Sequence, residues 1–175
     1  FTHPFTPYLF EVKFLDFPNG QNDATVIEQF KELAEQQSVG AFIFEPLIQG
    51  ASGMRMYQAE TLQALLEVAK QHSIITIADE VFTGFYRTGK FLATHHIPHL
   101  PDIIALSKGI TGGALPLGAT LVNQKIYQAF VSADFSKAFL HGHSYTANPL
   151  ACAAANASFK LLLQADCQQR IQGIA

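Results

Sequence analysis

Apolar residues recur at helical spacing in three stretches of the chain. In the first, between Thr25 and Gln37, they stand three and four positions apart, as on one face of a helix. Asp23 or Thr25 could cap its first turn. The second stretch repeats this spacing with leucines, and the third is rich in alanine. We predict helices over residues 25–37, 60–72 and 148–163.

Four short runs between these stretches are apolar on both faces, which is typical of strands buried inside a sheet. They cover residues 39–44, 74–78, 102–106 and 117–122. Buried strands that alternate with helices indicate a mostly parallel sheet with helices on both faces. The pattern therefore predicts an α/β fold, with residues 1–23 forming irregular structure before it.

Charged residues follow three of the four predicted strands. Glu45, Asp79 and Lys108 each stand at or near the point where an apolar run ends. In parallel sheets the functional groups gather at the carboxyl ends of the strands. We therefore expect these three side chains to lie at one edge of the sheet.

Lys108 is the first candidate for chemistry. A lysine held near a protein interior has a lowered pKa, so its neutral amine can attack a carbonyl and form a Schiff base. The glycines that follow, Gly109, Gly112 and Gly113, would let the backbone approach a bulky ligand closely. The alternative is a strand-end lysine that points into solvent.

Asp79 stands 29 positions before Lys108. A carboxylate there could pair with a protonated ring nitrogen and keep an electron-sink cofactor electrophilic. The alternative is an aspartate that caps the next turn. Val81 and Phe82 could pack on a ring face, and Arg87 is either a surface charge or a brace that pairs with a carboxylate.

The segment from His141 to Tyr145 precedes the alanine-rich helix. Ser144 and the neighbouring backbone amides could bind a phosphate near that helix's N-terminus, although Ser144 could instead cap the helix or form a local turn. His141 and His143 have no third ligand at a sensible spacing, so we predict no metal site.

Composition limits the remaining possibilities. Hydrophobic residues make up 49% of the 175 residues, charged residues make up 14%, and the net charge is −3. No basic stripe for nucleic acid and no membrane-spanning run is present. Cys152 and Cys167 lack metal-ligand spacing, and we expect reduced thiols in a cytoplasmic protein. Because neither end shows a natural boundary, we expect both to be cuts through a longer protein.

Three motifs together resemble the core of the class-III aminotransferases: Glu45–Gly50, Ala78–Gly89 and Ser107–Gly113. The resemblance implies the fold-type I architecture, which is aspartate aminotransferase-like. It also implies that residues 1–175 form part of the large domain that binds pyridoxal 5'-phosphate, without the N-terminal segment and the C-terminal small domain. Members of the family work as homodimers with active sites at the subunit interface.

The resemblance also implies roles for single residues. Lys108 would hold the cofactor as a Schiff base and carry the proton during catalysis. Asp79 would pair with the pyridine nitrogen, and Val81 would pack on the ring. Ser144 would bind the cofactor phosphate in the neighbouring subunit's site, and Gly142 would lie near the substrate carboxylate.

Residues 50–57 and 148–158 are most similar to the branch of the family that works in biotin biosynthesis. That branch aminates 8-amino-7-oxononanoate, with S-adenosylmethionine as the expected amino donor. Other branches usually carry an acidic residue at the position of Ala51 and often Gln at the position of Phe82. The alternatives are another ω-amino-acid aminotransferase, an aminomutase, or a non-catalytic scaffold of the same fold.

Overall fold

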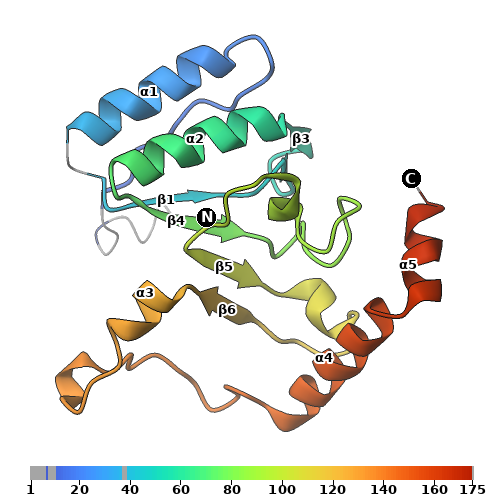
Figure 1. The fold of residues 1–175 in the computed structure, drawn as a ribbon. Coiled ribbons are helices and arrows are strands. Elements are labelled where there is room, and N and C mark those ends of the chain that lie inside the picture. The colour runs from blue at the N-terminus through green and yellow to red at the C-terminus, as the bar shows by residue number, and fades with distance from the viewer. Residues whose placement is uncertain (1–6, 8–10, 37–38, 175) are drawn as a thin grey trace.

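The computed structural model describes residues 7, 11–36 and 39–174. Its central sheet has four strands in the order β1-β4-β5-β6. Both β1 with β4 and β4 with β5 run parallel, whereas β6 is antiparallel to β5. The strands are β1 (Ala41–Phe44), β4 (Ile75–Asp79), β5 (Ile103–Leu106) and β6 (Ala119–Val122). The prediction of an α/β fold with a mostly parallel sheet is confirmed (Figure 1).

The predicted helices are present with small shifts at their ends. They are α1 (Asp23–Glu35), α2 (Ala59–Gln71) and α4 (Pro149–Leu162). The residue before α1 is Asn22, and Asp23 lies in the first turn, so the expected cap at Asp23 or Thr25 is wrong. The Asp23 carboxylate is directed elsewhere, because it accepts hydrogen bonds from the Gly20 amide and the Thr61 hydroxyl.

Several short elements were not predicted from the sequence. A two-stranded hairpin pairs β2 (Ile48–Gln49) with β3 (Arg55–Met56), and each strand is too short to show an alternating pattern. The others are α3 (Gln124–Gln128), α5 (Ala165–Gln172), and the 3₁₀ helices η2 (Ala93–His96), η3 (Lys108–Thr111) and η4 (Phe135–Lys137).

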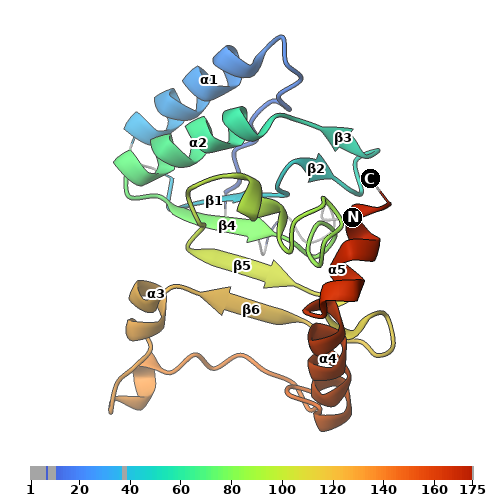
Figure 2. The same cartoon turned by 45° about the vertical axis from the view of Figure 1, so that its right-hand side comes forward.

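The hydrophobic core lies between α1, α2 and the first two strands of the sheet. One cluster joins Val26 and Phe30 of α1 to Leu65 and Ala69 of α2. A second cluster packs the other side of α2 against β1 and β4. Figures 1 and 2 show α1 and α2 lying side by side on the same side of the sheet. On the opposite face of β1, Ile43 is 66% exposed, so that face has no such cover within the described chain.

The last third of the chain is more open. After β6, the chain runs through α3 and η4 to α4 and α5, which lie near the carboxyl end of β5 (Figure 2). Helix α4 packs on η3, where the Gly112 backbone lies beside Ser158. None of the helices among the described residues combines the length and apolar character that a membrane crossing needs.

Candidate active site

Parallel pairing places the three charged strand ends next to one another. Phe44 of β1 pairs with Ala78 of β4, so the residues that follow, Glu45 and Asp79, occupy neighbouring positions. Asp79 pairs with Ala105 of β5, three residues before Lys108. Neighbouring strands lie about 4.8 Å apart. Two carboxylates and an amine therefore follow three adjacent strands at the carboxyl ends of the sheet, which we call the sheet edge.

Lys108 begins η3 in a left-handed backbone conformation, with φ 46°. This conformation is costly for a residue with a side chain and is found where the surroundings impose it. The preceding residue is fixed, because the Ser107 hydroxyl donates to the Leu117 carbonyl at 2.7 Å. The Lys108 ammonium nitrogen lies 5.6 Å from the centre of the Phe82 ring. The residue is exposed, so the expected placement near the interior is wrong for the described chain.

Asp79 is partly buried at the end of β4. Its Oδ1 accepts a hydrogen bond from the Val81 amide at 3.0 Å, so the aspartate does cap the next turn, as the alternative interpretation expected. That contact uses one carboxylate oxygen and leaves acceptor sites on both for another partner. Capping the turn and pairing with a ring nitrogen are therefore compatible.

Phe82, which the sequence suggested could pack on a ring face, makes several contacts at this edge. A Cβ atom placed on Gly50 would lie 3.0 Å from the Phe82 ring, so a larger residue there would require the ring to shift. The Gly50 amide donates to Glu45 Oε2 at 2.8 Å, which holds the first residue after β2 against the ring. The Arg87 guanidinium also faces this ring, at 5.5 Å from its centre, and makes no ion pair within the described part of the chain. Of the two alternatives for Arg87, the structure favours the surface charge: the residue is exposed, and its contact is with the Phe82 ring and not with a carboxylate.

Tyr57 supports the same edge from below. Its hydroxyl donates to the Glu45 carbonyl at 2.8 Å, and its amide donates to the Leu47 carbonyl at 3.0 Å. Burial raises the pKa of the Tyr57 phenol well above its usual range, so the phenol stays a neutral hydrogen-bond donor. Glu45, Gln49 and Arg55 belong to this framework, and Arg55 donates to the Gln49 side chain at 2.8 Å.

Ser144 and Gly142 do not join Lys108 and Asp79 within this chain. Both are exposed, in the segment before α4. Helix α4 meets η3 near Ser158, ten residues after its N-cap Asn148. At 1.5 Å per residue, these two points on the helix are roughly 15 Å apart. The Asn148 side chain caps the helix, accepting from the Leu150 and Ala151 amides, so Ser144 is not the cap.

The two histidines of this segment make local contacts. His143 Nδ1 accepts from the Tyr145 amide at 3.1 Å, and the His141 ring packs against Phe139. Among the described residues, no group of three or more His, Cys, Asp or Glu side chains is arranged to hold a metal ion.

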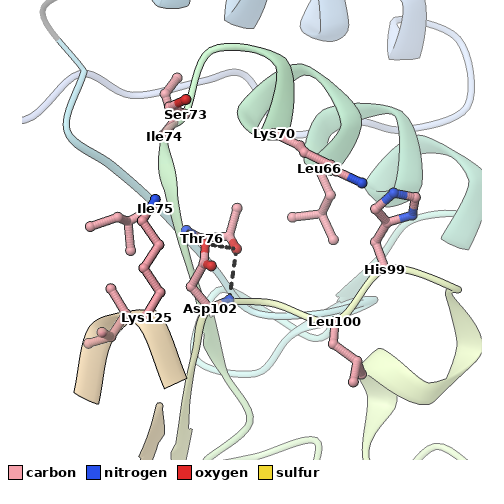
Figure 3. Close-up of a pocket in the computed structure, with 11 residues that line it drawn as sticks. Leu66, Lys70, Ser73, Ile74, Ile75, Thr76, His99, Leu100, Asp102 and Lys125 are labelled. Atoms are coloured by element: carbon pink, nitrogen blue, oxygen red, sulfur yellow. Dashed lines mark hydrogen bonds between the residues drawn. The ribbon is translucent and has the colours of Figure 1, made fainter. Parts of the chain in front are cut away.

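A cavity of about 300 Å³ lies at the opposite edge of the sheet, between α2, α3 and the amino ends of β4 and β5 (Figure 3). Lys70, His99 and Lys125 lie around it. Its carboxylate, Asp102, already accepts from the amide and hydroxyl of Thr76, both at 2.9 Å. Asp102 therefore ties two strands together, and this cavity is separate from the charged strand ends.

Several curated proteins are similar to this chain in sequence. An adenosylmethionine-8-amino-7-oxononanoate aminotransferase from Synechococcus elongatus is 44% identical over 182 residues, which cover 99% of this chain and 42% of the relative. Another from Helicobacter pylori is 43% identical, covering 90% of this chain and 37% of the relative.

Solved structures agree with these relatives. The same-named enzyme from Methanocaldococcus jannaschii is 34% identical with a TM-score of 0.85, covering 99% of this chain and 40% of that one. An amine transaminase from an uncultivated Pseudomonas species, solved in its PLP-bound form, is 39% identical with a TM-score of 0.77, covering 85% of this chain and 36% of that one.

The chain spans about two fifths of the length of the curated relatives it matches. It matches the class-III aminotransferase family over residues 1–175, and its charged strand ends lie in the order that the resemblance implied. The chain belongs to the class-III aminotransferase family.

Proposed function

We propose that this chain is part of the large domain of an aminotransferase that uses pyridoxal 5'-phosphate. The enzyme aminates 8-amino-7-oxononanoate to 7,8-diaminononanoate in biotin biosynthesis, with S-adenosylmethionine as amino donor. The observation that carries the proposal is the register that sets Asp79 beside Ala105, three residues before Lys108. The substrate assignment rests on the relatives, because several are named for this reaction.

The donor set at the sheet edge fits this cofactor. An aldehyde needs an amine, and a protonated ring nitrogen needs a carboxylate, and Lys108 and Asp79 supply them from neighbouring strands. The Gly50 backbone packs closely against the Phe82 ring, so an aromatic side chain lines this edge. In this proposal Val81, whose amide donates to the Asp79 carboxylate, would pack on the cofactor ring.

When bound, the cofactor acts as an electron sink for the carbanion that forms at the amino-bearing carbon. The Lys108 amine holds the cofactor and, once released, moves a proton to and from that carbon as a general base and acid. The Asp79 carboxylate holds the proton on the ring nitrogen, and the Val81–Asp79 hydrogen bond keeps the carboxylate oriented. These two groups are the catalytic core that the proposal requires.

We further propose a homodimer in which Ser144 binds the cofactor phosphate in the partner's site and Gly142 lies near the substrate carboxylate. Two features support this. Both residues are exposed. They lie just before the N-terminus of α4, which is the end of the helix that points away from its contact with η3. Their surroundings also carry large exposed apolar side chains, including Leu140 at 74% and Tyr145 at 76%. The unpaired thiols of Cys152 and Cys167 agree with a cytoplasmic location.

The second candidate is another class-III ω-amino-acid aminotransferase or an aminomutase. An ornithine aminotransferase from Plasmodium yoelii is similar at 35% identity, although its TM-score of 0.68 is below the 0.85 of the Methanocaldococcus jannaschii enzyme. The same edge chemistry would serve such an enzyme, so the choice depends on the substrate. Turnover of the full-length enzyme with β-alanine or ornithine, but not with S-adenosylmethionine or lysine, would favour this candidate.

The test of the cofactor assignment is Lys108→Ala in the full-length protein. We expect the wild type to show an absorbance band near the visible edge, and the variant to lose that band and at least roughly a thousandfold in kcat. Lys125→Ala, at the opposite edge of the sheet, is the matched control and should change neither. A wild type without the band would favour the non-catalytic scaffold, and a variant that keeps band and turnover would refute the role of Lys108.

A further inference from the structure

Glu80 is a buried carboxylate that the proposed chemistry does not use. It follows Asp79 directly, and its exposed fraction is 0%. Its backbone amide donates to the Ala105 carbonyl of β5 at 2.9 Å, and its carbonyl accepts from the Gly84 amide at 2.9 Å. A carboxylate is removed from water at high cost unless its oxygens receive hydrogen bonds. Its partners therefore indicate what it holds in place.

Four donors surround the Glu80 carboxylate. Oε1 accepts from the Thr94 amide and the Thr94 hydroxyl, both at 2.8 Å. Oε2 accepts from the Ala93 amide at 3.0 Å and from the Thr83 hydroxyl at 2.6 Å. Both threonines are themselves 0% exposed. The carboxylate thus joins the end of β4 to the first turn of η2 and closes the intervening segment into a loop, residues 80–94 (the 80–94 loop).

Two aromatic side chains of the 80–94 loop lie beside Lys108 and the residue that follows it. The Phe82 ring faces the Lys108 amine, 5.6 Å from its nitrogen. The Phe85 side chain lies against the next residue, since a Cβ atom on Gly109 would come within 2.9 Å of the Phe85 ring. Phe85 itself has a left-handed backbone, φ 60°, and its amide donates to the Phe91 carbonyl at 2.7 Å. The loop therefore faces the amine of the candidate lysine and packs against the residue that follows it.

We propose that Glu80 is a positioning residue: its buried carboxylate fixes the 80–94 loop, and the loop in turn fixes Lys108 and its left-handed backbone at the sheet edge. This inference rests on the proposed function, because it gives Lys108 its catalytic role. Glu80 touches neither substrate nor reacting atoms; it acts through Phe82 and Phe85.

Glu80→Gln in the full-length holoenzyme is a sharp test, because each carboxylate oxygen receives one backbone amide. In either orientation, the glutamine amide group therefore points an N–H group at a backbone N–H group. We expect kcat to fall roughly 10- to 100-fold through misplacement of the lysine, with KM changing less than about threefold. The visible circular dichroism of the bound cofactor should change as well, because it reports how the ring is held.

A second pair of variants keeps the test decisive if Glu80→Gln fails to fold. Thr94→Val removes one hydroxyl donor while keeping the side-chain shape and the backbone amide, and should lower kcat in the same direction. Thr94→Ser restores the hydroxyl and should restore kcat and the dichroism.

Thr61→Val is the matched control, since Thr61 is also a buried threonine whose hydroxyl donates to a carboxylate, that of Asp23. It should lower Tm without changing kcat or the dichroism. If Glu80→Gln and Thr94→Val lower Tm as this control does but keep wild-type kcat and dichroism, Glu80 is only structural and the inference fails. A wild type without cofactor band or turnover would instead be a failure of the proposed function.

Discussion

The two ends of this chain differ in how they bury apolar side chains. From α1 to β4, the chain builds two clusters from its own residues, and Leu62 and Ala69 of α2 are 0% exposed. From β6 to α5, Ala151 is the one buried hydrophobic residue in the described chain. Most of the large apolar side chains there are exposed by 41% or more, as is Ile174 just after α5: Leu121, Val122, Tyr127, Phe130, Val131, Phe135, Phe139, Leu140, Tyr145, Leu150, Phe159, Leu161 and Leu163.

This difference shows which part of the domain is self-sufficient. Most apolar side chains from α1 to β4 are covered by the chain itself, whereas most of those from β6 to α5 are not. The candidate active site lies where the two regions meet, because Asp79 ends the last strand of the first region and Lys108 begins η3, on which α4 packs. The site is thus anchored on its β4 side by a closed core. On its other side it borders the region whose large apolar side chains are mostly exposed.

The largest expected effect is in the closed core. Leu62→Ala removes a fully buried side chain of α2 and should lower the free energy of unfolding of the full-length protein by about 2–5 kcal/mol, through lost burial and the cavity left behind. Denaturant unfolding with an unchanged m value is the measurement. Leu100→Ala, at a residue 68% exposed, is the control and should cost less than about 0.5 kcal/mol. Equal losses in both variants would contradict the place of Leu62 in a closed core.

A smaller effect is expected in the open region. Leu140 is 74% exposed, and a charge there would have to be desolvated if a second copy covers it. Leu140→Glu should therefore weaken dimerisation by about tenfold or more, close to 1.4 kcal/mol, with little change in protomer folding. Sedimentation over a concentration series measures this. Should the wild type be monomeric, or should the variant dimerise as tightly as the wild type, Leu140 lies outside any dimer interface.

The smallest effect is at the contact between α1 and α2. The Thr61 hydroxyl donates to Asp23 Oδ2 at 2.5 Å, and this hydrogen bond lowers the pKa of the Asp23 carboxyl below its usual value. A lowered native pKa stabilises the fold at pH values above the ordinary carboxyl pKa of about 3.9, and this stability is lost as the pH falls through the native value.

Thr61→Val should thus reduce the free energy of unfolding at neutral pH, and the difference from wild type should shrink as the solution is acidified below pH of about 4. Urea unfolding of both proteins across that range is the measurement. A difference that stays constant or grows on acidification would show that the lowered pKa of Asp23 does not contribute.

Sequence alone located the elements whose residues bury themselves. The strands ending at Phe44, Asp79 and Leu106 are continuous apolar runs, and the register between them follows from parallel pairing. The antiparallel direction of β6 was not predictable from its residues, because a short apolar run looks the same in either direction. The β2–β3 hairpin was not predicted either, because a strand of two residues is too short to show an alternation of apolar and polar positions.

At the site, residue type was a better guide than environment. An amine and a carboxylate at strand ends were visible in the sequence, but the exposure of Lys108 was not. Glutamate is usually a surface residue, and only the structure shows that the Glu80 carboxylate is enclosed by four donors. Phe82 was visible as a candidate for packing on a ring, but its contacts with Gly50 and Lys108 were not, because these residues lie far away in the chain.

The close approach of Gly50 to Phe82 constrains how this edge could change over generations. Any side chain at position 50 would meet the ring at 3.0 Å, and the Glu45 carboxylate stands 3.4 Å away on the other side. A larger residue at position 50 therefore requires the aromatic ring to shift or to be replaced by a smaller side chain. The two positions are coupled, and a smaller side chain at position 82 would ease a substitution at position 50.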